Sequence, residues 1–239
     1  PHREVLLRFV ESQSHSKKFP GPNPWSLERR HFKLLQTEKY WVAPKTDGVR
    51  AALVCLAVDG ENIVAFMDRA RRLWILPNTT LHLCTAWFHG TLLDGEVFER
   101  DFLIFDALTV AGVGVGHLSF SGRLDTIVPG LMLHQRAQNE VPLLRIYLKA
   151  FDVGKDFQEE RATAPGVDGL ILMPEHHPYV VGRHKALFKV KVNHTIDFQV
   201  LPDQQLGILA NGAVVPAGRL SDGHPAMTPG SIVECEPRG

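Results

Sequence analysis

The chain has 239 residues, with 26 basic and 26 acidic side chains, 44% apolar residues and 22% charged residues. This composition is ordinary for a globular domain, and zero net charge argues against a broad, sequence-independent grip on nucleic acid, which needs an excess of Lys and Arg. We expect no membrane partner, because no apolar run is long enough to span a bilayer and no N-terminal signal pattern is present.

The N-terminal part of the chain combines a polar segment with regularly spaced prolines. Residues 1–18 are predicted to form a helix or an arm. The prolines over 20–24 restrict φ and favour an extended segment. Ser26 is expected to cap a helix near 27–36, because a serine side chain accepts a hydrogen bond from the free backbone N–H groups of a first helical turn.

From 40 to 110, short apolar runs alternate with turn signals, which predicts a series of β-strands. Turns are expected at 59–60, where Asp-Gly is typical of a tight hairpin, and at 77–78, where the sequence is Pro-Asn. The glycines over 112–116 predict a loop before a helix near 119–138, since their spacing does not fit a dinucleotide-binding fingerprint.

The second half of the chain begins with a predicted strand near 144–151 and a polar helix near 153–162. Two strands are then expected between 168 and 192. After residue 194 the pattern changes, which marks a candidate domain boundary. From there Gly and Pro separate four short β runs, at 196–201, 206–210, 213–216 and 231–236.

The segment 45–50, Lys-Thr-Asp-Gly-Val-Arg, lies between apolar runs at 40–44 and 51–58. A lysine at the mouth of a strand suits a nucleophile, because a deprotonated amine attacks electrophilic centres. The glycine that follows lets a ligand approach the backbone closely. The same Asp-Gly pair is typical of a surface β-hairpin, so this segment alone leaves both interpretations open.

Acid–glycine pairs and lysines recur beside later apolar strands, at 94–96, 168–169 and 189–191. Lys189 and Lys191 are two residues apart, so their side chains point to the same side of a strand. Two cations on one face are unfavourable unless an anion lies between them, and a phosphate is the natural anion. Solvated turns and a solvated strand face are the alternative interpretation.

Taken together, these segments resemble the nucleotidyltransferase domain of GTP:RNA guanylyltransferases, the mRNA capping enzymes. These enzymes share a covalent lysine-nucleotidyltransferase superfamily with the ATP-dependent DNA and RNA ligases. Several stretches are most similar to the capping enzymes of large DNA viruses. The resemblance covers almost the whole chain through residues 45–50 (motif I), Asp68-Arg69 (Ia), 94–96 (III), Phe105-Asp106 (IIIa), Asp168-Gly169 (IV) and 189–191 (V).

The resemblance implies an α+β fold with two parts. Residues 1–193 are expected to form an ATP-grasp-like nucleotidyltransferase domain of antiparallel sheets flanked by helices, and residues 194–239 a partial OB-fold. Motif VI, an Arg-x-Asp-Lys-like segment of the OB-fold, does not occur in the sequence. In the family this motif orients the β- and γ-phosphates, so we expect the 239-residue chain to bind GTP or GMP and to form little covalent adduct.

The resemblance also implies that the chain is an mRNA guanylyltransferase that acts in two steps. Lys45 attacks the α-phosphate of GTP and expels pyrophosphate, and the 5′-diphosphate end of an RNA then takes the GMP to form the cap. Lys189 and Lys191 are expected to balance the charge that develops on the α-phosphate. Asp168 is expected to bind a Mg²⁺ or Mn²⁺ ion, because hard cations take oxygen ligands.

The remaining nucleotide contacts are assigned by the resemblance to six side chains. Buried ion pairs are the alternative role for the charged residues on the early strands, and a core position is the alternative for Phe105. The expected contacts are Arg50 with the sugar, Arg69 and Glu96 with ribose and phosphate, Phe105 with the purine face, Lys149 with guanine O6 and Arg183 with the triphosphate tail.

The family further implies an RNA triphosphatase and a methyltransferase, in cis or in trans, an RNA polymerase C-terminal tail as a docking partner, and action in the nucleus or a viral factory. Two alternatives stay open. An ATP-dependent polynucleotide ligase shares the lysine chemistry, although residues 19–24, Thr46 and Lys149 favour capping. A non-catalytic docking module is disfavoured because the nucleophile, motif III, IV and V residues are all present.

Overall fold

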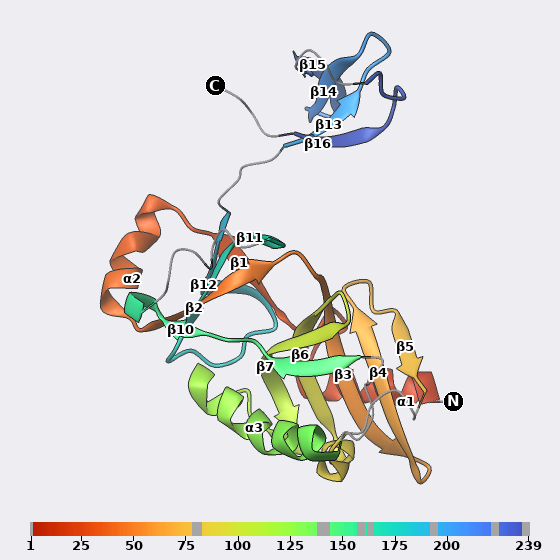
Figure 1. Cartoon of the computed structure of the whole chain (residues 1–239), viewed down its shortest axis with the longest axis vertical. Helices are drawn as coiled ribbons and strands as arrows, with labels where there is room; N and C mark the ends of the chain where they lie inside the picture. The colour runs from red at the N-terminus through yellow and green to blue at the C-terminus, as the bar shows by residue number, and fades with distance from the viewer. Residues whose placement is uncertain are drawn as a thin grey trace. The chain divides into compact units, whose positions relative to one another are not determined.

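The computed structural model describes residues 2–77, 83–137, 144–156, 161, 165–191, 196–220 and 225–235. The chain separates into two compact units, Pro1–Val190 and Lys191–Gly239 (Figure 1). Within the described residues, no helix is both long and apolar enough to cross a membrane.

The larger sheet of the first unit has seven strands and is covered on both faces. The strands are β3 (Val49–Val58), β4 (Glu61–Asp68), β5 (Leu73–Leu76), β6 (Thr91–Phe98), β7 (Asp101–Val110) and β8 (Val113–Gly114), in the order β5-β4-β3-β6-β7-β8, with β9 (Arg145–Leu148) parallel to β7. Helix α1 (His2–Ser14) packs on one face and α3 (Phe120–Ala137) on the other (Figure 1). Because both faces are covered, β3 is apolar and buried continuously from Ala51 to Cys55.

The smaller sheet of the first unit joins segments that lie far apart in the sequence. Its strands are β1 (Pro22–Ser26), β2 (Tyr40–Thr46), β10 (Asp152–Val153), β11 (Val167–Pro174) and β12 (Gly182–Lys191), in the order β1-β12-β11-β2-β10. Strand β1 runs parallel to β12 and forms an edge of the sheet. Short helices connect the elements: η1 (Arg29–His31), α2 (Phe32–Thr37), η2 (Thr85–His89) and η3 (Gly154–Asp156).

The second unit contains a four-stranded antiparallel sheet. Its described strands agree with the four predicted runs: β13 (Ile196–Val200), β14 (Gln205–Ala210), β15 (Ala213–Arg219) and β16 (Ile232–Cys235), in the order β15-β14-β13-β16. Val200 and Leu206 are buried, whereas Leu209 and Ile232 are 72% and 66% exposed. The assignment of this unit to an OB-fold stays a prediction.

The predicted helix near 27–36 is wrong in its first half. Ser26 does not cap a helix but ends β1, where it pairs with Lys189 of β12. The backbone N–H of Leu27 also donates to the carbonyl of Lys189, at 3.0 Å. Because a neighbouring strand already satisfies these backbone groups, helical structure begins only at Arg29, as the 3-10 turn η1, and becomes α-helical at Phe32.

Two further predictions differ from the structure. The glycine run is not a plain loop, because Val113 pairs with Val110 in a hairpin whose turn residues Ala111 and Gly112 have φ of 50° and 81°. The polar helix near 153–162 is replaced, over its described part, by β10 and the single turn η3. Residues 157–160, and Asn78 of the predicted Pro-Asn turn, lie outside the described residues.

Candidate active site

Lys45 lies near the end of β2, at the point where the chain passes from one sheet to the other. The connecting pair, Asp47-Gly48, joins β2 of the five-stranded sheet to β3 of the seven-stranded sheet, so the hairpin interpretation is wrong. A Cβ atom on Gly48 would lie 2.8 Å from the carbonyl oxygen of Val97. Glycine is therefore required here by close packing of the backbone against β6.

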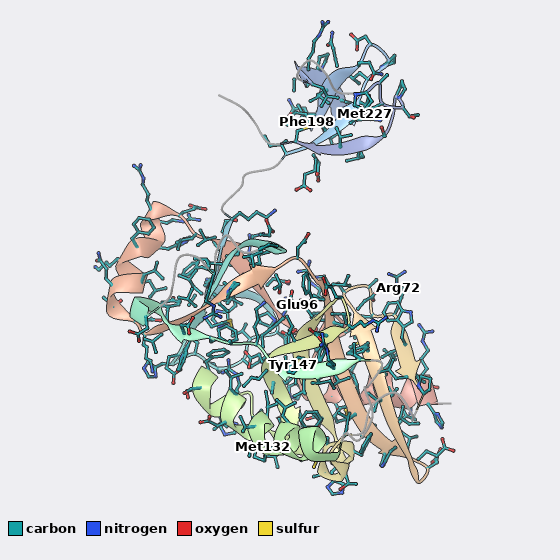
Figure 2. All side chains as sticks on the ribbon, viewed as in Figure 1. Arg72, Glu96, Met132, Tyr147, Phe198 and Met227 are labelled. Atoms are coloured by element: carbon teal, nitrogen blue, oxygen red, sulfur yellow. The ribbon has the colours of Figure 1, made fainter. Side chains whose placement is uncertain are left out.

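A cleft opens at this junction and is lined by residues of both sheets. Glu96, one of these lining residues, is labelled in Figure 2. Its apolar lining includes Phe105 of β7 and Ile171, Met173 and Leu187 of the five-stranded sheet. An apolar cleft with a few converging polar groups is the usual form of a small-molecule site. The predicted site residues that line it are Lys45, Arg50, Arg69, Glu96, Phe105 and Lys149.

The nucleophile predicted in motif I is paired with the acid predicted in motif IV. Lys45 Nζ lies 2.5 Å from Asp168 Oδ2, and each side chain is 26% exposed. Asp168 comes from β11, which pairs with β2 and has an irregular register between Val167 and Leu170. This sheet pairing brings together two residues that are distant in the sequence, at the rim of the cleft.

Lys149, Glu96 and Thr46 form a partly buried polar group. Lys149 Nζ lies 2.5 Å from Glu96 Oε1 and 2.8 Å from Thr46 Oγ1, and the Thr46 hydroxyl donates to the same carboxylate oxygen. Burial lowers the pKa of Lys149 below its ordinary value and the charge of Lys45 adds to this effect, whereas Glu96 opposes it. Thr46 was not predicted as a site residue.

Arg50 makes a two-pronged ion pair with Asp94. Its Nε and Nη2 atoms lie 3.0 and 2.5 Å from the two carboxylate oxygens, and Nη1 donates to the Pro22 carbonyl at 2.6 Å. Asp94 outweighs the effect of burial and raises the pKa of Arg50. The guanidinium also lies 5.4 Å from the centre of the Phe105 ring, so Arg50 contributes to the cleft while forming the buried pair.

Asp94 belongs to the predicted motif III, but no role of its own at the site was predicted for it. It is 2% exposed and also accepts a hydrogen bond from the Tyr179 hydroxyl, at 3.0 Å. The other predicted ribose contact, Arg69, is exposed at the cleft and donates to Asn23 Oδ1 at 3.3 Å. The structure therefore holds Arg50 firmly and leaves Arg69 more accessible.

The cations of β12 lie beside the cleft. Arg183 and Lys189 line an adjacent recess, and Pro24 lines both the recess and the cleft. Strand alternation places Arg183, Leu187 and Lys189 on one face of β12. Lys191, at the end of β12, lies outside the linings of the cleft and of the recess.

Residues 3–193 match the family described as mRNA capping enzyme, catalytic domain. The chain is 28% identical over 231 residues to mRNA-capping enzyme subunit alpha of Neurospora crassa, covering 83% of this chain and 57% of that protein. It is 27% identical over 214 residues to the same subunit of Schizosaccharomyces pombe, covering 76% and 53%. The chain thus spans about half the length of these curated relatives, and its predicted likeness to viral enzymes stays a prediction.

Solved structures share the fold at low sequence identity. A mycobacterial DNA ligase D complexed with ATP and MES matches with a TM-score of 0.52 and 15% identity, covering 85% of this chain and 72% of that chain. The ATP-dependent DNA ligase from bacteriophage T7 matches with a TM-score of 0.50 and 14% identity, covering 90% and 80%. These matches confirm the predicted α+β nucleotidyltransferase fold, and the family match over residues 3–193 shows that the chain belongs to the catalytic-domain family of mRNA capping enzymes.

Proposed function

We propose that the protein is an mRNA guanylyltransferase, which transfers GMP from GTP to the 5′-diphosphate end of RNA through a covalent intermediate on Lys45. The observation that carries the proposal is the position of Lys45, at the rim of an apolar cleft and beside Asp168. Membership of the capping enzyme family supports the same activity.

In the first step the Lys45 Nζ lone pair attacks the α-phosphorus of GTP. A P–N bond forms, the bond from the α-phosphorus to the bridging oxygen breaks, and pyrophosphate leaves with the electron pair while Nζ loses a proton. Lys45 must first be released from Asp168, because an ammonium that donates to a carboxylate has no lone pair for attack. Lys189 and Arg183 lie beside the cleft, where they balance the negative charge of the phosphates.

In the second step an oxygen of the RNA β-phosphate attacks the same phosphorus. A P–O bond forms and the P–N bond breaks, and the electron pair returns to Nζ, which takes up a proton. The products are the capped RNA end and free Lys45. The 5′-diphosphate substrate requires a triphosphatase upstream, and a methyltransferase would act on the product; we propose both as partners, in cis or in trans.

The part of the cleft that is lined by Phe105 and Lys149 is suited to guanine and its ribose. Phe105 supplies an apolar ring on which a purine can stack. Lys149 donates hydrogen bonds and cannot accept them, so it suits O6 of guanine and opposes the amino group of adenine. Glu96 and Thr46 hold the Lys149 ammonium in place, so the lysine is positioned before the nucleotide arrives.

A divalent cation could be held beside Lys45 by one protein carboxylate together with the substrate phosphates. The described residues contain no cluster of three or more His, Cys, Asp or Glu side chains suited to a metal ion. Mg²⁺ is commonly held by one or two carboxylates together with substrate phosphates, and Asp168 provides such a carboxylate beside Lys45. Bound there, a Mg²⁺ or Mn²⁺ ion would neutralise phosphate charge during the transfer.

The proposal is tested by nucleotide labelling of the full-length protein. Incubation with α-labelled GTP and Mg²⁺ or Mn²⁺ should label the protein, and α-labelled ATP should not. Lys45→Arg should abolish the label, because arginine keeps its proton and cannot attack. A Lys33→Ala variant, changed at an exposed position on α2, serves as the control that should label normally. Labelling by ATP instead of GTP would identify a ligase, and labelling of Lys45→Arg would move the nucleophile elsewhere.

A further inference from the structure

If the proposed function holds, the two displacements at the GMP phosphorus constrain the path of the RNA. An in-line displacement places the entering and leaving groups on opposite sides of the phosphorus. Lys45 enters opposite pyrophosphate in the first step and leaves opposite the RNA diphosphate in the second. The RNA 5′ end must therefore occupy the side from which pyrophosphate departed.

The recess beside the cleft is the candidate for that side, because it contains Arg183, the residue expected to contact the triphosphate tail. Arg183 and Lys189 line it, together with Trp25, Glu28 and Arg30. Strand β1, which carries Trp25, is an edge strand. An RNA strand whose 5′-phosphates bind Arg183 and Lys189 and which then follows this edge would pass Trp25 directly.

Two features of Trp25 suit a ligand-binding residue: an indole N–H donor that no described residue pairs with, and a ring face that a cation contacts. Its Nε1 atom is buried and has no hydrogen-bond partner within the part of the chain that the structure describes. The Arg183 guanidinium lies 4.3 Å from the centre of its ring. If Arg183 turned towards bound phosphates, the face of the indole ring that it contacts would become available to a nucleobase.

Arg30 supplies a second, movable cation at this place. Its guanidinium lies 5.9 Å from the centre of the Trp25 ring and pairs with Glu28 at 3.0 Å. The side chains of this pair are 63% and 54% exposed, so exchanging the carboxylate for a phosphate costs little. We infer that Trp25 and Arg30 bind the first transcribed nucleotide of the RNA, with its base stacked on the indole ring and its phosphates between Arg183 and Lys189.

A second cationic groove offers the competing route and a matched control. It is lined by Lys17, Lys18, Arg69 and Arg71, and it reaches the cleft through Arg69. Positive charge alone does not distinguish the two routes. The in-line displacement distinguishes them, because it requires the RNA 5′ end to lie beside Arg183 and Lys189, and Lys17 and Lys18 lie outside the recess that these two residues line.

The test measures equilibrium binding of a short, 3′-labelled RNA with a 5′-diphosphate end by fluorescence anisotropy. Trp25→Ala should weaken binding about tenfold, as expected for loss of one stacked base, and Trp25→Phe should retain most of the affinity because it keeps a ring. Arg30→Ala should weaken binding several-fold and reduce its salt dependence. Pyrophosphate should compete with the RNA in the wild-type protein.

The control variant Lys17→Ala/Lys18→Ala should bind this RNA as the wild type does. GTP affinity, measured on every variant, should stay unchanged and reports a correctly folded cleft. Wild-type RNA affinity in Trp25→Ala, loss of affinity in the control variant instead, or RNA binding that pyrophosphate leaves unaffected would each overturn the site. Because these are binding measurements, a failure here with intact labelling of Lys45 removes only the RNA site, whereas absent labelling removes the proposed function itself.

Discussion

The two ends of the cleft differ in how their charges are balanced. The end that carries Arg50 and Lys149 is called the neutral end, and the end beside the recess with Arg183 and Lys189 is called the cationic end. At the end formed by the seven-stranded sheet, the side chains of Arg50 and Lys149 are only 15% and 9% exposed, and each is paired with a carboxylate. At the end formed by β12, Arg183 is exposed and Lys189 is half-buried beside an open recess. Buried charges are tolerated only when paired, whereas exposed cations cost little. The neutral end therefore suits an uncharged base and sugar, and the cationic end suits a polyphosphate.

Removing one partner of an ion pair at the neutral end should cause the largest loss of protein stability. Asp94→Asn keeps the shape of the side chain but leaves the Arg50 charge without its counter-ion. We expect the free energy of unfolding to fall by about 3–5 kcal/mol, measured by urea denaturation. The matched control is Asp101→Asn on β7, whose partner Arg145 is 48% exposed; its effect should stay below about 1 kcal/mol. Equal losses in both variants would contradict the distinction between buried and exposed pairs.

The cationic end should respond in the opposite way, through activity and not through stability. Lys189→Ala should slow formation of the Lys45 adduct by about 100- to 1,000-fold, because a positioned charge on the phosphates is lost. The free energy of unfolding should change by no more than about 0.5 kcal/mol. Single-turnover labelling of the full-length protein with GTP and urea denaturation measure the two quantities, and a large loss of stability would place Lys189 with the structural pairs.

Within the neutral end, Lys149 and Phe105 should affect the preference for GTP over ATP differently. Lys149→Met should weaken GTP binding by about 2 kcal/mol, roughly 30-fold, and narrow the difference between GTP and ATP. Phe105→Ala should weaken both nucleotides alike, since a stacking ring does not distinguish the purines. Calorimetric titration with both nucleotides measures this, and an unchanged preference in Lys149→Met would show that guanine is read by another group.

Exposed and buried ionisable side chains also alternate within strand β12, where the exposed Arg183 is followed by the buried His184. Burial, helped by the charges of His177 and Arg123, lowers the pKa of His184 from 6.5 to about 4. The unfolded chain therefore binds a proton at a higher pH than the folded protein does. Stability is complete above about pH 6.5 and should fall by about 2 kcal/mol as the pH decreases to 4, after allowance for solvent screening. His184→Gln should flatten this decline in urea denaturation, and an identical slope would assign it to other groups.

Features that depend on neighbours in the sequence could be predicted. The Asp59-Gly60 turn is local, and its φ values of 51° and 84° are those that Asp-Gly adopts readily in a tight hairpin. The helix expected after Ser26 failed for the converse reason. Its backbone groups bond to β12, a partner that no local pattern reveals.

The site shows the same limit. Residue types at motif spacing identified Lys45, Asp168 and Glu96 as candidates. The structure places Lys45 and Glu96 in the lining of the cleft and pairs Asp168 with Lys45. The pairing between them depends on strand register. Arg50 lies opposite Glu96 across β3 and β6, yet it bonds to Asp94, two residues along the same face, because Lys149 already holds Glu96.

The order of strands in the two sheets has a consequence for the folding pathway. In the seven-stranded sheet most neighbours follow each other in the chain, whereas the five-stranded sheet joins β1 to β12 and β2 to β11. Contacts with long sequence separation require costly loop closure, so the five-stranded sheet should form late and open first. Lys45 belongs to that sheet, so activity should vanish at denaturant concentrations where β3 and β6 remain protected. Native-state hydrogen exchange would show this as faster amide exchange in β2 and β11.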